Sequence, residues 1–212
     1  DVDPQFDLFR RLGREEVPPA ISQALGAKRM VVILPSSERG HLLSAYRRLA
    51  KALGTSGPDE VEVRLDTEME KLPVDSTIAV MGWENRFVGS MISALSPYAV
   101  ALDKKSIRIE QSEIPRQNHS VVLTARNPGN KDLCWMFIAS DKPEALRGLG
   151  RKLSHYHKYS YLGFEGDEPE NIAKGRWPVL DSPMTAFFPD KDGEIVKIGM
   201  GILAPRRPLT EP

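Results

Sequence analysis

The sequence predicts an α/β protein: a three-layer sandwich with a mixed, mostly parallel sheet and helices on both faces. A short apolar run followed by an amphipathic, helix-like stretch occurs three times, beginning near residues 30, 77 and 133. The turn sequence Asn-Pro-Gly-Asn at residues 127–130 indicates a hairpin and therefore some antiparallel pairing. The three units share only their apolar pattern, which is typical of the fold class and is not a sequence repeat.

Composition limits the classes of protein to which the chain can belong. Its 212 residues, of which 41% are hydrophobic, suit one domain or one domain with appendages, and no apolar run is long enough to span a bilayer. Lys and Arg together number 29, as do Asp and Glu, which argues against a nucleic-acid partner because phosphate binding needs a basic excess. The single cysteine, Cys134, excludes an internal disulfide, and its apolar neighbours predict that it is buried.

Composition also suggests three parts. Residues 1–27 are expected to form a lead-in arm or linker, residues 28–166 the α/β domain, and residues 167–212 an extension that wraps the domain. Because the chain starts at Asp1 without a methionine or a signal pattern, we expect a processed product or a piece of a longer protein.

The first unit begins with a β-branched run, Met30–Leu34, whose lack of polar alternation predicts a strand covered on both faces. Pro35 ends it, and the hydroxyls of Ser36 and Ser37 are expected to cap the next helix. That helix has an apolar stripe between residues 42 and 53, and a half-covered strand follows at residues 61–65.

The second unit has a strand around residues 78–81, a loop at residues 82–85 and a helix with apolar positions from Phe87 to Leu95. Pro97 is expected to end that helix. Short strands near residues 107–109 and 121–123 lead into the hairpin turn.

The third unit consists of a buried strand from residue 133, a helix and a strand at residues 159–164. Asp141 and Glu144 have capping-box spacing, and Pro143 fits the first helical turn. A late strand is predicted near residues 195–203, before a frayed tail.

Loops at the carboxyl ends of parallel strands are the expected place for a site. Ser36 and Ser37 lie in the first such loop, where a helix N-terminus could hold an anion or a sugar, although capping explains both serines equally well. None of these loops is glycine-rich in the manner of dinucleotide or P-loop sites, and no Gly-x-Ser-x-Gly elbow marks a hydrolase nucleophile.

The second and third loops supply the remaining candidates for ligand binding. Trp83, Glu84 and Asn85 combine aromatic and polar groups that could contact a ligand or partner, although Asn85 equally fits the N-cap of the next helix. Asp141 stands in the third loop, where the capping box is the alternative reading.

His155 and His157 are the candidate metal ligands. On a strand their side chains would share one face and could bind a metal with Glu165 or Asp167. The alternative is a surface turn between helix and strand, with the rings packed on tyrosines.

Three segments resemble the region after the catalytic domain in bacterial membrane-alanyl-type zinc aminopeptidases. They are FDLFRRLGREEVPPAISQALGA, ARNPGNKDLCWMFIAS and RKLSHYHKYSYLGFEGDEPENIAKGRWPVLDSPM, which together span much of the chain. The resemblance implies a non-catalytic accessory domain of a larger, envelope-associated or periplasmic peptidase, with the preceding catalytic domain as its partner. Such enzymes bind zinc through His-Glu-x-x-His, which this sequence lacks.

The first functional hypothesis is therefore an accessory domain that docks on, or positions, a peptidase domain, with no cofactor and no catalytic residue of its own. The alternative is a small free-standing hydrolase or metal-dependent enzyme that uses the strand-end loops and the pair His155 and His157. A third hypothesis is a domain that binds a sugar or small anion at Ser36 and Ser37.

Overall fold

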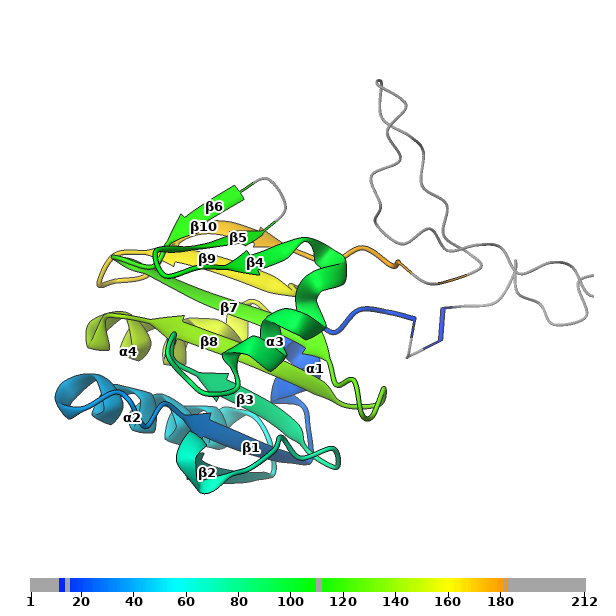
Figure 1. Cartoon of the computed structure of the whole chain (residues 1–212), viewed down its shortest axis with the longest axis horizontal. Coiled ribbons are helices and arrows are strands. Elements are labelled where there is room, and N and C mark those ends of the chain that lie inside the picture. Colours follow the sequence, from blue (N-terminus) through cyan, green and yellow to red (C-terminus); the bar gives the residue numbers. More distant parts are fainter. Residues whose placement is uncertain (1–11, 14–15, 110–111, 181, 183–212) are drawn as a thin grey trace, which may run out of the picture. The chain divides into compact units, whose positions relative to one another are not determined.

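The computed structural model of the chain describes residues 12–13, 16–109, 112–180 and 182 (Figure 1). The chain divides into two units, one from Pro18 to Trp177 and the other formed by residues 1–17 and 178–212. All the helices and strands that the structure describes belong to the first unit. The late strand predicted near residues 195–203 falls outside the described residues, and so does the part of the predicted extension of residues 167–212 that lies beyond residue 182.

The main sheet has seven strands in the order β10-β9-β7-β8-β3-β1-β2. Their bounds are β1 Arg29–Leu34, β2 Glu60–Leu65, β3 Thr77–Met81, β7 His119–Arg126, β8 Cys134–Ser140, β9 Tyr161–Glu165 and β10 Glu170–Gly175. The pairs β1–β2, β1–β3 and β3–β8 are parallel, whereas β7–β8, β7–β9 and β9–β10 are antiparallel. The α/β class, the mixed sheet and the hairpin are confirmed, but parallel and antiparallel pairings are equally frequent among the described strands of this sheet.

A second, three-stranded antiparallel sheet was not predicted. It consists of β4 (Val100–Leu102), β5 (Ser106–Ile109) and β6 (Ser112–Pro115), in that order. Four of its apolar side chains are buried in the core shared with the main sheet: Val100, Ile107, Ile109 and Ile114. The sequence indicated only the strand near residues 107–109, which is β5, because β4 and β6 have three and four residues and show no clear alternation.

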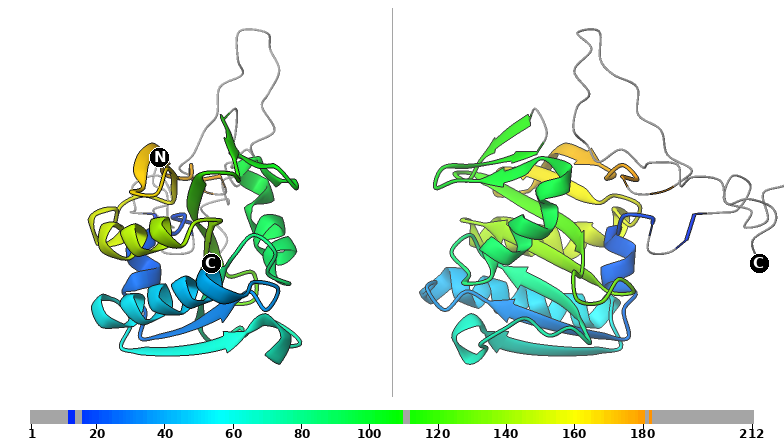
Figure 2. Two further views of the ribbon diagram at one scale, coloured as in Figure 1. Left: turned by 90° about the vertical axis from the view of Figure 1, so that its left-hand side faces the viewer. Right: turned by 45° about the vertical axis from the view of Figure 1, so that its right-hand side comes forward.

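Helices lie on both faces of the main sheet, and Figure 2 shows α2 and α4 on one side and α3 on the other. The α-helices are α1 Ile21–Leu25, α2 Gly40–Ser56, α3 Val88–Leu95 and α4 Pro143–Lys152, and the 3₁₀ helices are η1 Asp66–Glu68, η2 Ser96–Tyr98 and η3 Leu153–His155. Val32 belongs to the core shared with α1, α2 and α4, and its neighbour Ile33 to the core shared with α3 and the small sheet. This alternation explains why inner strands such as β1 and β3 are apolar almost without interruption.

The folded unit is longer at both ends than the predicted domain of residues 28–166. In α1, which precedes that range, Ile21 is fully buried. Beyond residue 166, β10 joins the sheet. Trp177 is buried between Tyr98 and Tyr161, with ring centroids 4.8 and 4.7 Å away. A five-residue helix and a polar edge strand carry no strong hydrophobic pattern, so neither is apparent from the sequence.

The predicted helix caps are wrong, although the helices themselves are confirmed. The N-cap residues are Arg39 for α2, Phe87 for α3 and Lys142 for α4, and none makes a side-chain capping hydrogen bond. Pro143 does begin α4, as predicted. The polar residues expected at these caps make other contacts, which are described below.

Cys134 is buried, as predicted. No helix among the described residues is both long enough and apolar enough to cross a membrane.

Candidate functional site

Loops that follow β1, β2 and β3 meet at the carboxyl edge of the parallel strands through the carboxylate of Asp66. This side chain is 1% exposed, and it accepts hydrogen bonds from the main-chain N–H of Ser36 at 3.0 Å and of Arg86 at 2.9 Å. Asp66 thus joins residues 30 positions before it to residues 20 positions after it. Sequence reasoning missed Asp66, because no local pattern distinguishes a buried carboxylate from the charged residues around it.

Close packing also fixes the second loop, at Gly82. Its φ of +90° is a conformation that L side chains rarely adopt, and an added Cβ would lie 2.6 Å from Cγ of Pro35. The Gly82 N–H donates to the carbonyl of Ile138 at 2.9 Å. The loop is therefore held against the ends of both neighbouring strands.

Asn85 is the most completely bonded of the predicted site residues. It is 4% exposed, and its Nδ2 donates to the carbonyls of Ile33 and Met81, each at 3.0 Å. Its Oδ1 accepts from the main-chain N–H of Phe87 at 3.1 Å. Asn85 therefore neither caps α3 nor faces solvent, and its amide ties the ends of two parallel strands together.

Trp83 and Glu84 lie on either side of Arg116, the last residue before the turn into β7. The Arg116 guanidinium lies 5.2 Å from the centroid of the buried Trp83 ring, and its Nη1 lies 2.6 Å from Oε1 of Glu84. Arg116 thereby joins the small sheet to the second loop by a cation–π contact and an ion pair. The Glu84 side chain is 63% exposed, so the ion pair is open to solvent.

Glu38 is the nearby carboxyl with a perturbed affinity for protons. Burial, and to a lesser extent the charge of Glu84, raise the pKa of Glu38 above its ordinary value.

Neither Ser36 nor Ser37 caps α2, which begins only at Gly40; Ser36 is half-buried and Ser37 exposed. The helix N-terminus proposed for anion binding therefore does not start at these serines.

The third loop follows β8 and is anchored by Ser140. The Ser140 hydroxyl accepts from Oγ of Ser120 at 2.9 Å and from the N–H of Lys142 at 3.1 Å. Asp141 is exposed and accepts from the N–H of Asn118 at 3.4 Å, so it makes no capping box with Glu144. The structure therefore places Asp141 at the rim of this edge, bonded to the turn before β7.

His155 and His157 are both exposed. His155 ends η3 and His157 follows in the turn that leads to β9, so neither lies on a strand. Among the residues that the structure describes, no three His, Cys, Asp or Glu side chains are grouped as a metal site would need.

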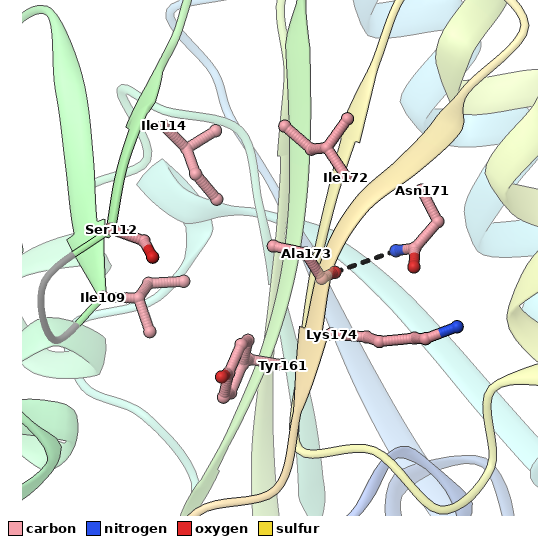
Figure 3. Close-up of a pocket in the computed structure, with 8 residues that line it drawn as sticks. All are labelled: Ile109, Ser112, Ile114, Tyr161, Asn171, Ile172, Ala173 and Lys174. Atoms are coloured by element: carbon pink, nitrogen blue, oxygen red, sulfur yellow. Dashed lines mark hydrogen bonds between the residues drawn. The ribbon is translucent and has the colours of Figure 1, made fainter.

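A separate groove lies between the small sheet and the last strand of the main sheet (Figure 3). Its volume is about 480 Å³, and its lining residues are Ile109, Ser112, Ile114, Tyr161, Asn171, Ile172, Ala173 and Lys174. They come from four strands, so local sequence patterns could not bring them together. The one local sign is Ile172, an apolar residue in the polar strand β10.

The sequence matches no protein-family model and no curated protein.

Proposed function

We propose that the chain is a non-catalytic accessory domain that docks on, or positions, a preceding peptidase domain of the same polypeptide in the cell envelope. One observation supports this most: two buried polar side chains at the carboxyl edge of the strands, Asp66 and Asn85, direct their polar atoms at the main chain. The partner class comes from the resemblance of three segments of the sequence to the region after the catalytic domain of zinc aminopeptidases.

A catalytic group needs a lone pair or proton directed at a substrate and a neighbour that adjusts its acidity. Asn85 directs its amide at two carbonyls and one N–H of the fold itself. Asp66 likewise directs both carboxylate oxygens at main-chain N–H groups. These contacts favour a rigid scaffold over a reaction centre at this edge.

The first test is an immunoblot of the source organism with an antibody raised to this chain. We expect a band well above 23.7 kDa, the mass of the chain. A band at that mass would overturn the docking role, and it would turn attention to the free-standing enzyme hypothesis.

The second test is an activity assay of the purified chain on aminoacyl p-nitroanilides, with and without added zinc. We expect no hydrolysis above the buffer rate in either condition. Zinc-dependent hydrolysis that is lost in His155→Ala but kept in His41→Ala would contradict a non-catalytic role. His41 is a suitable control because it is an exposed histidine in α2.

A further inference from the structure

We propose that the outer edge of β10 accepts an extended peptide segment as an added strand, and that this segment alternates apolar and acidic side chains. The inference rests on the docking role and gives that role a surface and a partner chemistry. Addition of a strand to a sheet edge is a general mode of peptide recognition, in which the main chain supplies affinity and alternate side chains supply specificity.

The groove follows the edge of a strand. Four consecutive residues of β10, Asn171 to Lys174, line it, and β10 is the terminal strand of the sheet among the described strands. The pairing of β10 with β9 shifts its register between Asn171 and Ala173, and this bulge directs both Ile172 and Ala173 into the groove, whereas Asn171 and Lys174 point to the other face (Figure 3). Because residues of both faces line the groove, it reaches the main chain of the strand. The ligand that best matches such an edge is another extended main chain.

One wall of the groove is apolar. Ile109 and Ile114 of the small sheet face Ile172 and Ala173 of β10 across it, with Tyr161 between them (Figure 3). Ile172 is 50% exposed, so the groove leaves half of a large apolar side chain in contact with water. A branched apolar side chain of the added strand would cover Ile172 and contact both sheets.

Two lysine ammonium groups lie over one tyrosine ring on the other face of β10. Figure 3 shows Lys174 directed away from the groove, and its Nζ lies 5.6 Å from the ring centroid of Tyr159. Lys158 lies over the same ring at 5.4 Å. Neither ammonium forms an ion pair with a carboxylate of the described residues, in contrast to Lys142, which pairs with Asp167 at 2.6 Å. An acidic side chain of the added strand would supply the missing counter-charge.

The other edge of the sheet, β2, differs in its charges. Glu62 forms ion pairs with Arg29 and Arg64, so its charged side chains neutralise one another. Its exposed apolar residue, Val63, is 42% exposed, close to the value for Ile172. Val63 therefore provides a matched control position at the opposite edge.

The test measures fluorescence anisotropy of the full chain with a fluorescein-labelled octapeptide in which valine alternates with glutamate. We expect Ile172→Lys to weaken binding at least tenfold, and Val63→Lys to change it less than twofold. The same peptide with N-methyl groups on alternate amides, which cannot pair along one edge, should lose binding at least tenfold. Both substituted side chains are exposed, and circular dichroism checks that the variants fold.

Charge reversal tests the acidic half of the pattern. Lys174→Glu should weaken binding of the valine–glutamate peptide at least threefold and strengthen binding of a valine–lysine peptide. Equal effects of Ile172→Lys and Val63→Lys, undiminished binding of the N-methylated peptide, or no binding by the natural chain would each overturn the inference. These outcomes leave the immunoblot result untouched, so the failure of this surface can be told apart from the failure of the docking role.

Discussion

The hydroxyl of Tyr46 bonds both main-chain groups of Ser140: it donates to the carbonyl at 2.6 Å and accepts from the N–H at 2.9 Å. The two residues are 94 positions apart, and both are buried. The contact joins α2 to the end of β8 at the edge where the strand-end loops meet.

Tyr46→Phe should destabilise the protein by about 1–3 kcal/mol, because it leaves two buried main-chain groups without the hydroxyl that bonds them. Urea denaturation followed by tryptophan fluorescence measures the change. Tyr156→Phe is the matched control, because Tyr156 packs through its ring on Tyr159 and Phe164 and keeps those contacts as phenylalanine. Equal stability of the Tyr46→Phe variant and the natural chain would show that the hydroxyl contributes nothing.

The same hydroxyl predicts a loss of stability in alkali. Burial raises the pKa of the Tyr46 phenol above its ordinary value of 10.0. Above pH 10.0 the unfolded chain releases a proton that the folded chain keeps, so the free energy of unfolding should fall as pH rises. Below that pH the contribution is fully present. Urea midpoints measured from pH 8 to pH 11 should fall less steeply in Tyr46→Phe, and parallel curves would refute the assignment to this residue.

Asn85→Asp should cost roughly 2 kcal/mol or more, because an acceptor oxygen replaces the amide that bonds the carbonyls of Ile33 and Met81. Thermal and urea unfolding measure the loss. Asn130→Asp is the control, since Asn130 uses only its Oδ1 to accept from the N–H of Asp132 at 3.1 Å and aspartate retains that acceptor. Similar losses in both variants would mean that the two carbonyls do not require the Asn85 amide.

A chain of residues 18–177 should unfold in one cooperative transition, and a chain of residues 28–166 should not. The shorter chain lacks α1, β10 and Trp177, whose Nε1 donates to the carbonyl of Thr124 at 2.7 Å. Circular dichroism during urea titration distinguishes the two. A sharp transition in the shorter chain would restore the boundaries suggested by the sequence.

The parts of the fold that were predicted correctly from the sequence are those that depend on local patterns. Met30–Leu34 was predicted as a strand covered on both faces, and its five residues are at most 3% exposed. The hairpin at residues 127–130 follows from turn chemistry that operates over four residues. Elements of this kind can be predicted from the spacing of apolar side chains or from the geometry of a turn alone.

The candidate site could not be predicted from local patterns, because its hydrogen-bond partners lie far apart in the sequence. Ser36 and Asn85 look like helix caps because their neighbours resemble helix starts, yet tertiary partners decide their bonds. The partner of the Ser36 N–H is Asp66, 30 positions away, and one partner of Asn85 is Ile33, 52 positions away. No periodicity encodes such pairs, so the network at the carboxyl edge becomes visible only in the fold.

The order of strands also divides the main sheet into two blocks of continuous sequence. Residues 29–81 supply β1, β2 and β3, residues 119–175 supply β7 to β10, and one parallel ladder, β3 with β8, joins the blocks. Pairing within the second block is largely local, whereas the ladder brings Ala79 to Met136 across a segment that contains α3 and the strands β4 to β7.

We therefore expect each block to begin forming separately during refolding, with closure of this ladder as the slow step. Ala79→Gly, at its centre, should slow refolding more than it speeds unfolding in stopped-flow experiments, whereas the opposite result would place closure after the barrier. The rate at which β3 pairs with β8 would then limit how fast the whole sheet assembles.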